Sequence, residues 1–238
     1  MPALIRICPG GLTMPQKSYI LPFVFGILAL ICLSIAPYLV FIYAGIEKEM
    51  GLAQKIFYYH VPSAFSMFLG SFLCFVFSVF YLWKRDKNCD LWAACSAEVS
   101  LLFGTLVLIT GAIWAKPIWG AWWVWDAQLT LTLILWLILA AYHMLRTYIE
   151  DAVQSARYRA VLGIIGFLNV PFIHYATKLW RTHHPEVVRG EEISLPPDMK
   201  IAFFFCVITF FALFFALLFK RVSLAKARDE LESLKAEI

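Results

Sequence analysis

The sequence predicts an all-α membrane protein, a polytopic bundle of six transmembrane helices. Of its 238 residues, 62% are hydrophobic and only 15% are charged, whereas soluble domains are about 45–50% apolar and about 25% charged. The apolar residues gather into six stretches, each close to the roughly 20 residues that a helix needs to cross a bilayer. These stretches use most of the chain, so residues 1–238 are expected to form a single integral membrane domain.

The six apolar stretches are followed by one more polar segment. The first stretch is too long for the apolar core of a signal peptide, so it is expected to be retained as a helix. From Ser223 onward, leucines recur among alternating charges, which predicts a small amphipathic helix. The predicted spans are 20–43, 61–83, 93–114, 129–145, 160–177 and 201–219, with a tail over 220–238.

The cysteines do not indicate a disulfide framework. Cys32, Cys74 and Cys206 lie deep inside apolar stretches, where cysteine behaves as a small hydrophobic residue. The others show no Cys-x-x-Cys spacing, which excludes the usual zinc and thioredoxin-like motifs. Cys-x-x-Cys-His is also absent, so the chain has no attachment motif for a covalent c-type haem.

The distribution of positive charge predicts the orientation of the bundle. Thirteen of the 20 Lys and Arg residues fall in segments on the same side as the N-terminus, and seven fall on the other side. The positive-inside rule therefore places both termini in the cytoplasm. The net charge of +4 reflects this topology, with membrane lipid as the expected surroundings and no sign of a nucleic-acid partner. The segments 44–60, 115–128 and 178–200 then share the outer face.

A tryptophan-rich segment precedes the fourth span. Residues 119–126 read Trp-Gly-Ala-Trp-Trp-Val-Trp-Asp, four of the nine tryptophans in the chain. An aromatic belt at the lipid boundary is one interpretation, but a belt needs only one or two indoles per helix end. A shelf for a flat aromatic ligand is favoured, with Gly120 allowing a turn and Asp126 capping the next helix. The candidate shelf residues are Trp114, Trp119, Gly120, Trp122, Trp123, Trp125 and Asp126.

Histidines accompany this segment on the same predicted face. His60 stands at the outer end of the second span, and His183 and His184 lie just beyond the fifth. Two neutral imidazoles can occupy the axial positions of a haem iron, and indoles can cover a porphyrin. A zinc site is disfavoured because zinc takes four close ligands. His174 lies inside the fifth span, where it is either a functional residue or a buried hydrogen-bonding group.

Three basic residues on the outer face are candidates to pair with haem propionates. They are Lys55, Lys116 and Arg181, since ammonium and guanidinium groups bind carboxylates well. Contact with lipid headgroups is the alternative for each of them.

The segment from Trp119 to Asp126, with Leu129-Thr130 following, strongly resembles the signature of the haem-handling "WWD" family. The length, the six spans, His60-Val61-Pro62 and the outer His184 resemble one branch, CcmC, also called haem exporter protein C. The resemblance implies an inner-membrane protein that binds haem b non-covalently at a periplasmic face and is not an enzyme. It also implies delivery to the haem chaperone CcmE, in a complex with the ABC transporter subunits CcmA and CcmB and the small membrane protein CcmD.

By position in that family, His60 and His184 would be the axial ligands and the tryptophan-rich segment the haem platform. His183 leaves the second ligand ambiguous by one residue. The family often has arginine where this chain has Gln128 and Lys55, which puts a propionate or chaperone contact at residue 128 in doubt.

Two other functions remain open on the sequence. One is a subunit of a split cytochrome c haem lyase, related to the larger synthetase branch of the family, whose proteins have many more spans. The other is a haem- or quinone-linked electron-transfer subunit. Such bundles place histidine ligands inside facing helices, and His174 is the residue that keeps this function open.

Overall fold

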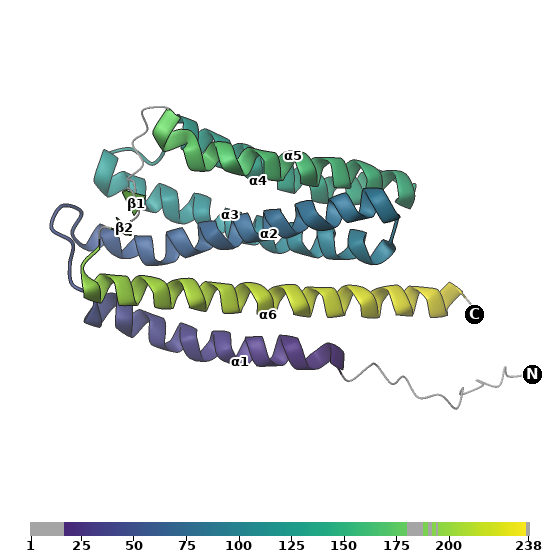
Figure 1. Ribbon diagram of the computed structural model, residues 1–238, viewed down its shortest axis with the longest axis horizontal. Helices are drawn as coiled ribbons and strands as arrows, with labels where there is room; N and C mark the ends of the chain where they lie inside the picture. Colours follow the sequence, from purple (N-terminus) through teal and green to yellow (C-terminus); the bar gives the residue numbers. More distant parts are fainter. Residues whose placement is uncertain (1–16, 180–187, 190–191, 194, 237–238) are drawn as a thin grey trace, which may run out of the picture.

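Three layers of paired helices make up the protein in the computed structural model (Figure 1). The structure describes residues 17–179, 188–189, 192–193 and 195–236. The middle pair contacts α6 on one side and both α4 and α5 on the other. The pairs are α1 (Lys17–Tyr38) with α6 (Pro197–Ala236), α2 (Phe57–Lys84) with α3 (Lys87–Trp119), and α4 (Ala127–Tyr148) with α5 (Ala152–Leu179).

Six helices in the described part of the chain are long and apolar enough to cross a membrane, which confirms the predicted number. Several boundaries differ from the prediction. The second helical stretch begins earlier, with the 3-10 turn η2 (Leu52–Ile56) leading into α2, and the third continues to Trp119. The tail is not a separate helix but the end of α6, whose 40 residues span about 60 Å at the rise of an α-helix. This is roughly twice the thickness of the hydrocarbon core.

The helix ends carry the local signals expected of them. Arg85 ends α2 in the left-handed conformation, with φ of 56°. Asp86 follows at once and caps α3, accepting a hydrogen bond of 2.9 Å from the Asn88 backbone N–H. Because this turn has only two residues, α2 and α3 must run antiparallel and side by side.

Small residues bring α2 and α3 close together. A Cβ on Gly70 would lie 2.7 Å from the Ser100 Cβ, so only glycine fits there. The Ser100 hydroxyl donates to the Met67 carbonyl at 2.7 Å and lies 2.9 Å from the Ser71 hydroxyl. Small residues and interhelical hydrogen bonds are the usual means of helix association in lipid.

The two ends of the bundle differ in character. One end, called the tryptophan end below, carries segment 120–126, η2, the π-helical turn η1 (Leu39–Tyr43), and the short antiparallel strands β1 (Val188–Arg189) and β2 (Glu192–Ile193). The opposite end carries Lys17, the α2–α3 turn and the C-terminus of α6 (Figure 1). Both described termini therefore lie at the opposite end.

Ion pairs tie the layers together near the opposite end. The Arg159 Nη2 of α5 donates to both carboxylate oxygens of Asp90 on α3, at 3.0 and 2.9 Å. The Arg221 Nε of α6 lies 2.8 and 2.7 Å from the two oxygens of Glu98, also on α3. Helix α3 is thus bonded to both flanking layers.

Candidate functional site

The described parts of the three segments 44–60, 115–128 and 178–200 all lie at the tryptophan end (Figure 1). This confirms that they share one end of the bundle, as predicted from the alternation of spans and loops. The side of the membrane that this end faces stays a prediction.

His60 occupies the first turns of α2 and is only 6% exposed. Its Nδ1 lies 2.9 Å from the Thr110 hydroxyl on α3. The imidazole also meets the Trp114 ring edge-on, with centroids 5.7 Å apart and planes at 65°. Since α2 begins at Phe57, four residues before the predicted start of the second span, the imidazole belongs to the helix itself.

Gly111 makes room for this imidazole. A Cβ at residue 111 would lie 3.1 Å from the His60 Cε1, closer than most side-chain contacts allow. Thr110 and Gly111 were both missed at the level of sequence. The available signal was a threonine beside a glycine inside an apolar stretch, but nothing in it relates residue 110 to residue 60.

Trp114 lies beneath the site and not on an exposed shelf. It is 6% exposed and belongs to a buried apolar cluster that joins α1, η1, α2, α3 and α6. Its ring packs edge-on against Phe57, with centroids 6.3 Å apart, and Phe57 stacks on Phe203 of α6 at 5.0 Å. Trp114 therefore supports the His60 ring from behind.

The remaining tryptophans differ in exposure. Trp122 and Trp125 are 59% and 77% exposed, whereas Trp119 and Trp123 are partly buried. Trp123 and Trp125 pack edge to face, with centroids 5.7 Å apart. The Trp123 indole Nε1 is buried and has no hydrogen-bond partner among the described residues. Two large aromatic faces are thus presented outward by a short segment.

Both ends of this segment are fixed by caps. Gly120 ends α3 in the left-handed conformation, with φ of 75°, which confirms the predicted turn. Asp126 begins α4, and its carboxylate accepts a hydrogen bond of 2.9 Å from the Leu129 backbone N–H, which confirms the predicted N-cap. Gln128 lies in the first turn of α4, and its buried Oε1 has no partner within the described ranges.

The basic residues proposed to pair with propionates differ in their exposure and hydrogen bonds. Lys116 is exposed, donates to the Gly120 carbonyl at 2.9 Å and lies 6.0 Å from the centre of the Trp122 ring. Lys55 is 4% exposed, and its ammonium donates to the Ala44 and Gly45 carbonyls, each at 2.7 Å. The expectation that Lys55 pairs with a propionate is corrected, because its ammonium is buried and bonded to the carbonyls that follow η1. Arg181 lies outside the described residues.

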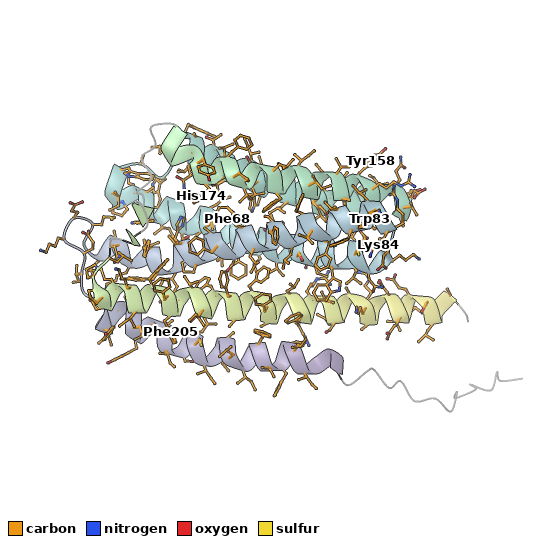
Figure 2. All side chains as sticks on the ribbon, viewed as in Figure 1. Phe68, Trp83, Lys84, Tyr158, His174 and Phe205 are labelled. Carbon is orange, nitrogen blue, oxygen red and sulfur yellow. The ribbon has the colours of Figure 1, made fainter. Side chains whose placement is uncertain are left out.

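The other histidines are not brought to His60 in the part of the chain that the structure describes. His174 is exposed on α5, toward the tryptophan end, whereas Trp83 and Lys84 mark the opposite end (Figure 2). His183 and His184 both lie outside the described residues. Across the described ranges, no group of three His, Cys, Asp or Glu residues is arranged to hold a metal ion.

Comparison with known proteins identifies the family. The model of the family described as "CcmC: Heme exporter protein C" matches residues 11–237. Heme exporter protein C of Escherichia coli K12 is 33% identical over 159 residues, 66% of this chain and 64% of the relative, so the match spans slightly less than two thirds of that protein. The protein of the same name from Bradyrhizobium diazoefficiens is 34% identical over 188 residues, 78% of this chain and 69% of the relative. That of Haemophilus influenzae is 29% identical over 209 residues, 87% of this chain and 85% of the relative. With nearly its whole length matched, the chain belongs to the heme exporter protein C (CcmC) family.

Proposed function

We propose that this chain binds haem b non-covalently at its tryptophan end and passes it on during cytochrome c maturation. One observation carries the proposal beyond family membership. The buried, hydrogen-bonded imidazole of His60 lies at the same end of the bundle as the two exposed indoles of Trp122 and Trp125. An imidazole and a set of aromatic faces are the groups that a haem iron and its macrocycle require.

His60 and His184 are the proposed axial ligands. Haem supplies an iron that accepts one imidazole on each side. The chain leaves α5 at Leu179 and re-enters the described part at Val188, and both points lie at the tryptophan end. In the sequence, His184 falls between these two points. His183 is the alternative ligand, one residue away.

The tryptophan segment is the proposed platform for the macrocycle. Trp122 and Trp125 offer the exposed faces, Trp119 and Trp123 are partly buried, and the caps at Gly120 and Asp126 fix the segment at both ends. Trp114 would act from beneath, through His60. Lys116 and Arg181 are the proposed propionate partners, and Gln128 could contact a propionate or the receiving chaperone.

The type of ligation suits a carrier and not an enzyme. Side-chain ligands exchange, so haem held by two imidazoles can be released to another protein, and the chain has no motif for covalent attachment. The proposed recipient is the haem chaperone CcmE. The proposed complex contains the ABC transporter subunits CcmA and CcmB and the small protein CcmD, in the bacterial inner membrane, with both termini in the cytoplasm.

Absorption spectra of the purified protein test the proposal. The haem-loaded protein should show the low-spin spectrum of bis-histidine ligation, and His60→Ala and His184→Ala should each abolish it. His143→Ala is the matched control, because His143 lies on α4 near the opposite end. If both single variants keep the unchanged spectrum, the ligand assignment is wrong.

Electron transfer within the bundle is not favoured. That function needs histidines directed between facing helices, and His174, the residue on which it depended, is exposed on α5. Co-purification distinguishes the two functions: a transporter and a periplasmic haem chaperone are expected, and a quinone oxidoreductase would contradict the proposal.

A further inference from the structure

We propose that Thr110 is a positioning residue that fixes the tautomer of His60, keeping the proton on Nδ1 and the lone pair on Nε2. The inference rests on the proposed function in so far as Nε2 is then the nitrogen that binds the haem iron. The tautomer itself can be tested without haem.

The argument begins with the single proton of the Thr110 hydroxyl. Its Oγ1 lies 2.6 Å from the Leu106 carbonyl oxygen, one helical turn earlier on α3. A carbonyl oxygen can only accept, so a contact this short requires the Thr110 hydroxyl to donate its proton to Leu106. The hydroxyl then has only lone pairs left for other partners.

The same Oγ1 lies 2.9 Å from the His60 Nδ1. Because the hydroxyl proton is already donated to Leu106, the proton in this second hydrogen bond must come from Nδ1. A neutral imidazole carries one proton and one lone pair on its two nitrogens, so the lone pair is on Nε2. Thr110 therefore selects one of two tautomers that are otherwise close in energy.

The residues around His60 prevent the imidazole from rotating to avoid this hydrogen bond. A half-turn of the imidazole would set the Cδ2 carbon against the Thr110 oxygen and lose the hydrogen bond. Gly111 on one side and Trp114 on another confine the ring, and its burial leaves little room for water to replace Thr110. A group that accepts a hydrogen bond from the ring nitrogen that does not bind the metal orients the imidazole and raises the basicity of the ligating nitrogen.

The same helix contains a matched control. Thr105 also donates its hydroxyl to the carbonyl four residues earlier, that of Leu101, at 2.9 Å. It also accepts from a ring N–H, that of the Trp136 indole on α4, at 2.9 Å. Thr105 thus repeats the chemistry of Thr110 on a partner that is not a ligand.

The first experiment uses the haem-free protein with ¹⁵N-labelled histidine in lipid nanodiscs. The ring ¹⁵N shifts of His60, assigned by their loss in His60→Ala, should report a protonated Nδ1 in the unmodified protein, in Thr110→Ser and in Thr105→Val. Thr110→Val keeps the shape and removes the acceptor, so the His60 shifts should move toward the other tautomer or a mixture. Unchanged shifts in Thr110→Val would overturn the inference.

The second experiment titrates haem into the same proteins. Thr110→Val should weaken haem binding roughly 10–100-fold, the usual effect of losing the partner of a ligating histidine, and Thr110→Ser should restore it. Thr105→Val should bind like the unmodified protein, and an equal loss there would contradict a specific role for Thr110. If His60→Ala leaves the haem spectrum intact, the ligand assignment fails, and the haem-free shifts still decide whether Thr110 sets the tautomer.

Discussion

Gly111 and His60 face each other across the α2–α3 contact, and the space between them is smaller than a methyl group needs. A Cβ on residue 111 would lie 3.1 Å from the His60 Cε1 and 3.7 Å from its Nδ1. Gly111→Ala should therefore shift the imidazole by a few tenths of an ångström and lengthen its hydrogen bond to Thr110. Haem affinity, measured by absorbance titration, is expected to fall about tenfold, at the lower limit for disturbing the support of a metal ligand.

Gly26→Ala is the matched control for this prediction. Gly26 also lies in a membrane helix, but a Cβ there would have no atom within 4 Å. It should leave haem affinity unchanged. An equal loss in both variants would mean that glycine acts through helix flexibility and not through contact with His60.

The exposed tryptophans should matter for haem and not for stability. Trp122 and Trp125 bury little surface, so Trp122→Ala and Trp125→Ala should barely change the melting temperature while speeding haem loss to a competing haem acceptor. Trp83, 76% exposed at the opposite end, is the matched control. Trp114→Ala should instead lower the melting temperature, because removing a buried tryptophan side chain costs about 3–5 kcal/mol of folding free energy. If Trp83→Ala releases haem as fast as Trp125→Ala, the platform assignment fails.

Asp126 is expected to act through its cap. Asn caps a helix as well as Asp, whereas Ala at this position costs about 1 kcal/mol. Asp126→Asn should therefore keep both the melting temperature and haem retention, and Asp126→Ala should lower both by loosening the segment that holds Trp125. Thermal unfolding and haem-transfer rates measure the two effects. A defect in Asp126→Asn as large as that in Asp126→Ala would show that the negative charge is what matters.

The sequence predicted those features that depend on neighbours along the chain. The caps at Gly120 and Asp126 reach only three or four residues, and each apolar run is long enough to define its own helix. The continuation of α3 to Trp119 was missed because the polar and proline residues just before it resemble a loop. Proline is tolerated in membrane helices, however, when neighbouring groups satisfy the backbone.

Features that depend on packing between helices could not be predicted in this way. The bond from His60 to Thr110 joins residues 50 positions apart and exists only in one register of α2 against α3. The burial of Lys55 is similar: a lysine beside a predicted span suggests a headgroup contact, but the fold turns its ammonium toward the carbonyls left open after η1. The burial of Trp114 likewise follows from its place in an apolar cluster with residues of α2 and α6, which no local pattern indicates.

The two ion pairs of α3 should contribute unequally to stability. Arg159 is almost fully buried beside Asp90, whereas Arg221 and Glu98 are both partly exposed. Asp90→Ala would leave a buried charge without its partner, at a cost of about 3–5 kcal/mol; Glu98→Ala should cost no more than about 1 kcal/mol. Melting in detergent should therefore shift on the order of 10 °C for the first variant, at roughly 2–4 °C per kcal/mol for a chain of this size. Equal shifts would contradict the ranking by burial.

The orientation of the bundle is testable with two exposed lysines at opposite ends. Lys48 lies in the loop before η2 at the tryptophan end, and Lys87 begins α3 at the other. The native cysteines are first replaced by alanine. Lys48→Cys should then react with a membrane-impermeant maleimide in bacteria whose outer membrane is permeabilised and whose inner membrane is intact. Lys87→Cys should react only once the inner membrane is opened, because the excess of positive charge retains its end in the cytoplasm. The reverse pattern would turn the tryptophan end toward the cytoplasm, where haem bound by His60 could not reach a periplasmic chaperone.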